Sequence, residues 1–305
     1  MQRAERLKAL LDPFVESRPW QARVQADPVE FPHRYTDPRD IETVALLSAS
    51  LAYGRADLFK PKIAGILEGL GPRPARALAS LDVVGAKDLL SGFVYRFNLP
   101  SDVAVLLLGM GRSLEKYGSL EGAFVAGKSA SWQTTLARFA KGLRAAAPEK
   151  EIVKRLGPIR GLHHLLPFAE AGAAKRLNLY LRWMVRGPDP IDFGIWKQLS
   201  PAQLVIPLDT HVMRISRWLG LTKRSTIGWA TAEEVTASLR QLDPADPVRY
   251  DFALCHYGMS GACPAKPLKA NCRVCPLRAE CRIGSRQAED LAEPVERLAG
   301  RRGLA

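Results

Sequence analysis

Apolar residues recur along most of the chain at intervals of three and four positions, the spacing that places them on one face of an α-helix. This pattern predicts helices over residues 41–53, 58–70, 101–117, 132–147, 175–185 and 209–219. The alternation of apolar and polar residues that is typical of strands is hardly visible. Gly and Pro residues separate the helical segments, as expected of connecting turns. The sequence therefore predicts an all-α fold.

The apolar runs also exclude one class of protein. No run approaches the roughly 18 to 20 residues that a membrane-spanning helix needs. The N-terminal segment carries Arg3, Arg6 and Lys8 without a following sustained apolar stretch, so it lacks the order of a secretory signal. We therefore expect a cytoplasmic protein with no membrane partner.

Composition adds a strong positive charge. The 305 residues include 44 Lys and Arg against 31 Asp and Glu, a formal charge of +13, and 47% are hydrophobic, which is ample for one large domain or two modest ones. Such an excess favours a polyanionic partner, with nucleic acid ahead of an anionic membrane face.

The cysteines form the strongest chemical signal, since all five lie between Cys255 and Cys281. Cys263, Cys272, Cys275 and Cys281 are separated by eight, two and five residues. Zinc ribbons usually contain two Cys-x-x-Cys pairs, whereas this stretch has one pair flanked by single cysteines. The spacing favours a loop wrapped around a 4Fe-4S cluster, with zinc as the alternative. Cys255 lies outside this set on a predicted helix, and we interpret it as a small buried apolar residue.

Lys175 is unusual for its position at the start of a predicted helix. It lies off the apolar stripe that begins at Leu177, and a cation is disfavoured at the positive end of a helix dipole. With Arg176 beside it, this environment favours the neutral amine that nucleophilic attack requires. An ordinary solvated lysine is the alternative interpretation.

Asp209 occupies a comparable position, directly before another predicted helix. By itself it is an ordinary N-cap residue. His211, two positions later, has no second histidine at metal-binding spacing, so we interpret it as a local polar residue.

Three features in order carry a resemblance to a known family. They are Lys175 on a helix shortly after Gly172, the segment LDTHVMRISRWLGL that contains Asp209, and the four-cysteine loop. This order, over about residues 165–281, resembles the helix-hairpin-helix DNA glycosylase superfamily, in particular the endonuclease III type. The segments LLSASLAYGRAD, KRLNLYLRWMVRG and LDTHVMRISRWLGL also resemble a bacterial family, domain of unknown function 2400.

The resemblance to the glycosylases implies a two-lobed fold. Residues 40–186 would form a helical barrel lobe that includes the hairpin and Lys175, and residues 1–39 with 187–286 would form a second lobe that carries Asp209 and the cluster loop. Residues 287–305 would be a tail. The hairpin, from Leu166 to Lys175, is longer than in the family and lacks one Gly.

The same resemblance implies base-excision chemistry on damaged DNA. Lys175 matches the lysine that attacks C1′ of a flipped nucleotide, with an oxidised purine as the expected base, and Asp209 matches the aspartate that assists it. The resulting Schiff base would permit lyase cleavage of an abasic strand. Cys263, Cys272 and Cys275, with Cys281, match the cluster ligands. The alternative is an iron–sulfur protein that binds DNA structures or RNA without glycosylase activity.

The positive charge is concentrated where this chemistry is expected. Eleven of the thirteen excess charges lie in residues 172–228 and 263–286, which predicts a phosphate-binding surface around the hairpin and the cysteine loop. We expect a monomer that binds damaged double-stranded DNA on the bacterial nucleoid. The aromatic residues Tyr53, Tyr95 and Phe97 are wedge candidates, although core positions are the better interpretation. The predicted DNA contacts are Gly172, Arg176, Arg214, Lys266, Lys269 and Arg273.

Overall fold

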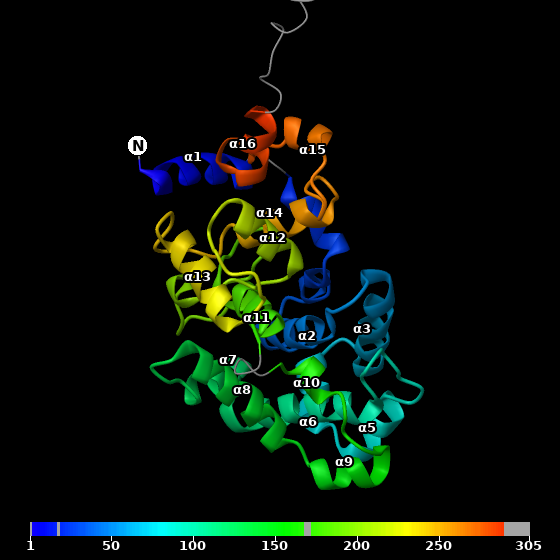
Figure 1. Ribbon diagram of the computed structural model, residues 1–305. Helices are drawn as coiled ribbons and strands as arrows, with labels where there is room; N and C mark the ends of the chain where they lie inside the picture. The colour runs from blue at the N-terminus through cyan, green and yellow to red at the C-terminus, as the bar shows by residue number, and fades with distance from the viewer. Residues whose placement is uncertain (1, 17–18, 168–171, 290–305) are drawn as a thin grey trace, which may run out of the picture.

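The computed structural model describes residues 2–16, 19–167 and 172–289, and these residues are mostly helical, which confirms the predicted all-α class (Figure 1). These ranges contain no β-strand, although Tyr95 and Asn98 form an isolated antiparallel bridge. The α-helices in chain order are α1 (Arg3–Glu16), α2 (Pro38–Leu51), α3 (Ala56–Leu70), α4 (Pro74–Ser80), α5 (Val83–Leu89), α6 (Pro100–Tyr117), α7 (Leu120–Ala126), α8 (Trp132–Ala146), α9 (Glu149–Leu156), α10 (Leu162–Leu165), α11 (Lys175–Val185), α12 (Thr210–Trp218), α13 (Trp229–Arg240), α14 (Asp251–Met259), α15 (Lys269–Arg273) and α16 (Arg282–Glu289).

Short 3-10 helices connect several of these elements. They are η1 (Trp20–Ala26), η2 (Pro28–Glu30), η3 (Pro32–Arg34), η4 (Pro201–Gln203) and η5 (Arg278–Glu280). Helix α11 coincides with its predicted range, and the other predicted helices differ from the observed ones by at most three residues at an end. The largest difference is at α2, which begins at Pro38 because the Asp37 side chain accepts a hydrogen bond from the Arg39 amide. No helix of the described ranges is long and apolar enough to cross a membrane.

Helix α6 is the central element of one group of helices. Its residues from Ser101 to Gly111 are buried, and it packs against α4, α5, α7, α8 and α9. Two glycines permit the closest approaches. A Cβ at Gly109 would collide with the carbonyl oxygen of Leu143 on α8, and a Cβ at Gly111 would collide with that of Leu78 on α4. The neighbouring helices therefore contact the backbone of α6 directly.

Gly109→Ala is expected to lower the free energy of unfolding by about 1 to 3 kcal/mol, because the new methyl group meets rigid backbone and α8 must move away. Urea denaturation measures the change. Gly142→Ala is the matched control, since a Cβ there meets nothing within 4 Å on the exposed side of α8, and it is expected to raise stability by a few tenths of a kcal/mol or more. If Gly109→Ala and Gly142→Ala change the free energy of unfolding equally, the close contact between Gly109 and α8 is not what makes Gly109→Ala destabilising.

A buried carboxylate joins α2 to the segment that follows α11. Glu42 is 3% exposed and accepts hydrogen bonds from the Leu120 amide at 2.8 Å, the Glu121 amide at 3.2 Å and the Trp196 indole at 2.9 Å. Trp196 is itself buried, as are Leu199 and Leu204, so the segment between α11 and α12 is packed against the helices. Burial raises the pKa of Glu42 to about 7, although the three donors act in the opposite direction.

Glu42 is expected to make stability depend on pH. Between its ordinary value of 4.5 and about 7, the folded protein retains a proton on Glu42 that the unfolded chain has released. The contribution of Glu42 to stability is therefore present below about pH 4.5 and lost as the pH rises towards 7, at no more than about 1.4 kcal/mol per pH unit. The free energy of unfolding of the wild type and of Glu42→Gln, measured by urea denaturation across this pH range, should change with pH at different slopes. Parallel profiles would show that Glu42 is ionised throughout.

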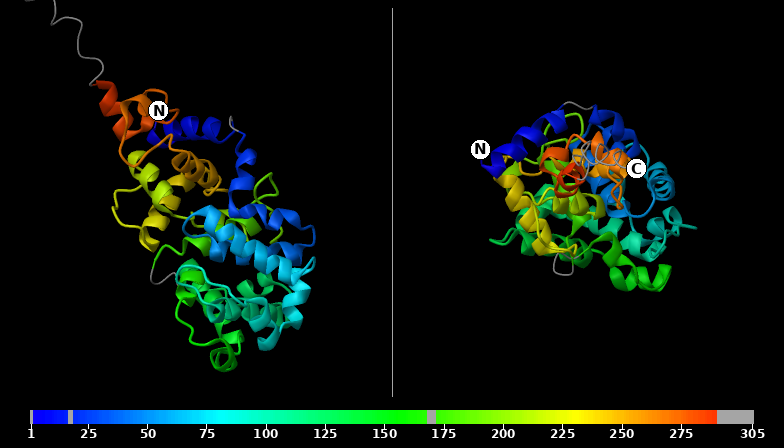
Figure 2. Two further views of the ribbon diagram at one scale, coloured as in Figure 1. Left: turned by 90° about the vertical axis from the view of Figure 1, so that its right-hand side faces the viewer. Right: turned by 45° about the horizontal axis from the view of Figure 1, so that its top comes forward.

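The first helix lies beside the last ones (Figures 1 and 2). Arg6 on α1 forms an ion pair with Glu280 at 2.7 Å, and the Arg3 guanidinium donates to the carbonyl oxygens of Leu219 and Gly220 at the end of α12. Segments from both ends of the chain therefore pack together around the cysteine loop. The sequence predicts a tail over residues 287–305. Positions 290–305 of this tail lie outside the described residues.

Candidate functional site

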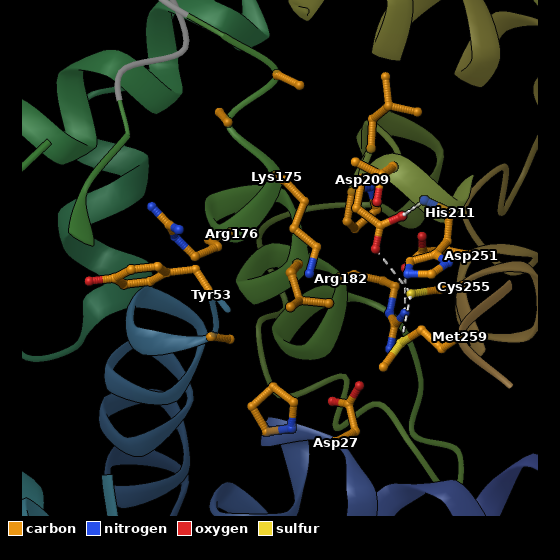
Figure 3. A pocket seen from close by; sticks show the side chains of 18 of the residues that line it. Asp27, Tyr53, Lys175, Arg176, Arg182, Asp209, His211, Asp251, Cys255 and Met259 are labelled. Carbon is orange, nitrogen blue, oxygen red and sulfur yellow. Dashed lines mark hydrogen bonds and ion pairs between the residues drawn. The ribbon is translucent and has the colours of Figure 1, made fainter. Parts of the chain in front are cut away.

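A cavity of about 680 Å³ lies where several separate stretches of the chain meet. Its walls come from the η1–η2 junction, the end of α2, the start of α3, the start of α11, the loop before α12, and α14 (Figure 3). Both residues predicted to carry the chemistry, Lys175 and Asp209, line it, and their side chains point into the same space. The volume is in the range of pockets that enclose a small organic ligand.

Lys175 is the first residue of α11 and is partly exposed to the cavity. The residue before it, Ala174, has φ 46° and ψ 37°, a left-handed conformation that non-glycine residues seldom adopt. Ala174 is 3% exposed and is held by packing, and the turn directs the start of α11 towards the cavity. The predicted hairpin lies partly outside the described residues, at positions 168–171, and Gly172 itself lines the cavity.

Asp209 uses its two carboxylate oxygens differently. Oδ1 accepts hydrogen bonds from the amides of His211 and Val212, both at 2.8 Å, and so caps α12. Oδ2 accepts a hydrogen bond from the Cys255 thiol at 3.2 Å on the cavity side. The N-cap interpretation and the functional one are therefore compatible, because capping fixes the carboxylate while one oxygen still faces the cavity.

Cys255 packs against the hydrophobic core, as expected of a small apolar residue, but it is not fully buried and it also belongs to this site. The side chain is partly exposed, lines the cavity and donates to Asp209. Burial raises the pKa of the Cys255 thiol well above its usual value, and the nearby Asp209 carboxylate adds to this effect. The neutral thiol is therefore a hydrogen-bond donor in this position. The Sγ atom also lies 3.7 Å from Met259 Sδ, one turn further along α14.

An ion-pair network forms the floor of the cavity. The Arg182 guanidinium is 2% exposed and contacts Asp192 Oδ1 at 3.0 Å and Asp251 Oδ2 at 2.6 Å. Burial raises the pKa of Asp251 to about 6, although the Arg182 charge acts in the opposite direction. Asp251 is one helical turn before Cys255 on α14, and it also lines the cavity. The carboxylates of Asp209 and Asp251 both lie on one side of the Lys175 amine (Figure 3), and the Lys175 charge acts on Asp251.

One side of the cavity carries aromatic and cationic groups. The Arg176 guanidinium lies 4.9 Å from the centre of the Tyr53 ring and donates to the carbonyl oxygen of His164. Burial lowers the pKa of Arg176 to about 10. Phe97 is 57% exposed and stacks on His164 with ring centres 4.6 Å apart. Of the wedge candidates, Tyr95 is a core residue, whereas Tyr53 lines the cavity and the exposed Phe97 is not a core residue.

The predicted DNA contacts divide into interior and exposed groups. Lys266, Lys269 and Arg273 are exposed on the cysteine loop. Arg214 donates instead to the Cys263 carbonyl oxygen at 2.6 Å, and so holds the loop against α12. Arg176, as described above, is largely buried at the cavity wall. Interior ion pairs also use Arg182 and Arg186, so these two side chains, counted as surface charge from the sequence, cannot bind phosphate.

The four predicted ligand cysteines line a second, small cavity together with Trp218, Pro264 and Pro267. The Tyr257 hydroxyl donates to Cys275 Sγ at 3.3 Å, and the Gly284 amide donates to Cys281 Sγ at 3.4 Å. Burial raises the pKa of the Cys263 thiol to about 11. Among the described residues, no group of three or more His, Cys, Asp or Glu side chains has the arrangement of a single-ion metal site.

The fold and the site define an all-α protein with a lysine–aspartate cavity and a separate four-cysteine loop. The chain belongs to the protein family of unknown function DUF2400, whose profile matches residues 27–260. The matched region includes both Lys175 and Asp209 and ends before the first loop cysteine, Cys263. A comparison with curated proteins finds no match.

Proposed function

We propose that the protein is a DNA base-excision repair glycosylase with associated abasic-site lyase activity. One observation carries this proposal: Lys175 and Asp209 are 34 positions apart in the sequence, yet both line the same cavity at the starts of two helices. An amine and a fixed carboxylate that face one enclosed space are the groups needed for attack on a sugar carbon. The resemblance of the sequence to helix-hairpin-helix glycosylases supports the same assignment.

In the proposed reaction a damaged nucleotide is rotated out of the duplex, because C1′ is inaccessible in stacked DNA. The Lys175 nitrogen bonds to C1′ while the bond from C1′ to the base breaks, and the base leaves with the bonding electron pair. Asp209 Oδ2 stabilises the positive charge that develops on the sugar. One proton of the Lys175 nitrogen passes to the departing base, and opening of the sugar ring, with a solvent proton taken up by O4′, then gives the protonated Schiff base. Removal of a C2′ proton then expels the 3′ phosphate and cleaves the strand.

The proposed architecture has two lobes around this cavity. Residues 40–186 would form the lobe with Lys175, and residues 1–39 with 187–286 the lobe with Asp209 and the cysteine loop. The ion pair between Arg6 and Glu280 supports the joining of both ends in one lobe. The exposed Lys266, Lys269 and Arg273 supply the phosphate-binding surface of a monomer on bacterial nucleoid DNA.

We further propose that Cys263, Cys272, Cys275 and Cys281 hold a 4Fe-4S cluster. The proposal is supported by the placement of all four cysteines in the wall of one small cavity, whose other walls include Trp218 and two prolines. Hydrogen-bond donors to Cys275 and Cys281 are also typical of thiolates that ligate a cluster. When bound, the cluster crosslinks the loop and compensates the buried thiolates, whose ionisation burial otherwise opposes.

The cluster proposal predicts a brown protein with broad visible absorbance and about four iron atoms per chain. Cys272→Ser is expected to abolish most of this absorbance, since it removes one of the four thiolates. Cys255→Ser is the matched control and should retain it, because Cys255 lines the other cavity. Absorbance spectra and metal analysis of the three proteins measure the outcome. A colourless wild type with one zinc per chain would establish the zinc alternative.

Borohydride trapping tests the glycosylase proposal. The wild type is mixed with duplexes that carry single lesions, including oxidised purines and an abasic site, and sodium borohydride is added. Reduction of the Schiff base should give a covalent protein–DNA complex with the abasic duplex and with at least one base lesion. No complex with any duplex, together with tight and salt-sensitive binding, would refute the proposal. That result would favour a nucleic-acid-binding protein without glycosylase activity, an alternative that the basic cysteine loop also supports.

A further inference from the structure

Asp27 is a carboxylate in the wall of the cavity that the proposed reaction does not use. It lies at the junction of η1 and η2, and Figure 3 shows it on the opposite side of the cavity from Asp209. Oδ1 accepts a hydrogen bond from the Val29 amide at 3.0 Å, and Oδ2 lies 3.1 Å from Nε2 of His256 on α14. The side chain is 14% exposed, so its oxygens are fixed by partners and still reach the cavity.

These contacts keep Asp27 ionised. Burial by itself raises the pKa of Asp27, but the hydrogen bond and charge of His256, with further help from the Val29 amide and Arg182, lower it below its ordinary value. An ionised carboxylate only accepts hydrogen bonds, so Nε2 of His256 is the donor. His256 is 4% exposed and lies against the Phe252 ring, with ring centres 4.1 Å apart. Both atoms of the pair are therefore held in place.

A fixed negative charge in this wall excludes some ligands and favours others. Phosphate would be repelled by Asp27 and by the carboxylates of Asp209 and Asp251 in the same cavity. Among the residues that the structure describes, each oxygen of Asp27 has one hydrogen-bond partner, and a carboxylate oxygen can accept a second hydrogen bond. The wall therefore fits a planar ligand that presents two adjacent N–H donors, with the Phe252 ring as an apolar neighbour.

We infer that Asp27 selects the excised base, by accepting hydrogen bonds from the ring N1–H and the 2-amino group of a guanine-type purine. This inference rests on the proposed function, since it assigns the base that enters the cavity. A guanine edge presents two donors side by side, hypoxanthine presents only the N1–H, and adenine presents an unprotonated N1. Recognition of a flipped base by its Watson–Crick edge is a general solution for enzymes of this kind. Asp27 is thus a specificity residue, separate from Lys175 and Asp209.

Equilibrium binding tests this inference without requiring turnover. The Lys175→Ala protein is titrated with duplexes that differ at one position, where a single unpaired nucleotide carries guanine, hypoxanthine or adenine, or is left out. Affinities are expressed relative to the duplex without this nucleotide. Guanine is expected to bind at least about tenfold more tightly than adenine, with hypoxanthine between them. Equal affinities for the three bases would overturn the inference.

Two further variants in the same background identify the residue. Asp27→Asn replaces one acceptor oxygen by a donor, and the preference for guanine over adenine should fall to about threefold or less. Asp82→Asn is the matched control, since Asp82 also caps a helix through its side chain but lies on the exposed surface at α5, and it should keep the full preference. A preference that persists in Asp27→Asn would assign recognition to another group. Failure of borohydride trapping refutes the glycosylase chemistry alone, so the two proposals fail by different measurements.

Discussion

Lys175→Ala is expected to lower the rate of borohydride trapping and of strand cleavage by roughly 1,000-fold or more, because no other lysine of the described residues lines the cavity. Two features of the site make the lysine hard to replace. It is the first residue of α11 and faces the cavity, and the arginines and histidines that also line the cavity are not primary amines. Single-turnover assays on abasic and lesion duplexes measure the loss.

Two controls separate nucleophilicity from charge and from general damage. Lys175→Arg retains a cation at the start of α11 and should still lose trapping. Lys154 is an exposed lysine on α9, and Lys154→Ala should leave trapping unchanged. DNA affinity of Lys175→Ala is expected to stay within about tenfold of the wild type, since one cation is removed from a broad basic surface. Strand cleavage that survives in Lys175→Ala would identify a different nucleophile and remove the basis of the proposed reaction.

The helices could be predicted well because their ends carry local signals. Helix α11 matched its predicted range, since its apolar stripe starts two residues after Lys175 and Gly187–Pro188 ends the periodic segment. The error at α2 arose because Pro38 and Asp40 were not recognised as a first helical turn behind the Asp37 cap. Such errors move an end by a few residues and leave the arrangement of helices unchanged.

The site was only partly predictable. Lys175 and Asp209 were found through the order of motifs, and the structure brings them together, but Asp27 comes from a segment that carries no motif and reaches the cavity only through tertiary packing. Cys255 had a signal that was missed. Asp251 and Cys255 are four positions apart on α14, so a carboxylate and a thiol share one face of this helix.

Charge counting from the sequence overestimated the surface available for phosphate. Arg182 and Arg186 lie in the segment with the largest positive excess, and an arginine in a basic segment is ordinarily assigned to the surface. Their partners explain the error, because Asp192 accepts from both guanidinium groups while being 1% exposed. The pairing depends on a turn after α11 that residue counts do not reveal.

The buried ion pairs of Arg182 carry the largest expected effect on stability. Arg182→Met should lower the free energy of unfolding by about 3 to 5 kcal/mol, because it leaves Asp192 and Asp251 buried without their main counter-charge. Urea denaturation near pH 7 measures the loss. Arg155→Met is the matched control, since Arg155 forms an exposed pair with Glu151 on α9, and it should cost less than about 1 kcal/mol.

The size of the Arg182 effect should also depend on its partners. Burial already raises the pKa of Asp251 to about 6, so the loss of Arg182 should raise it further and leave a protonated carboxyl beside Lys175 at neutral pH. Adding Asp251→Asn to Arg182→Met removes the carboxyl that has lost its ion-pair partner, and with it the cost of protonating or burying that group, and is expected to restore part of the lost stability. If the double variant is instead destabilised by the sum of the two single effects, Arg182 does not stabilise the fold through Asp251. The floor of the cavity would then be maintained by packing of the Arg182 side chain, which contacts the Phe252 ring, and not by its charge.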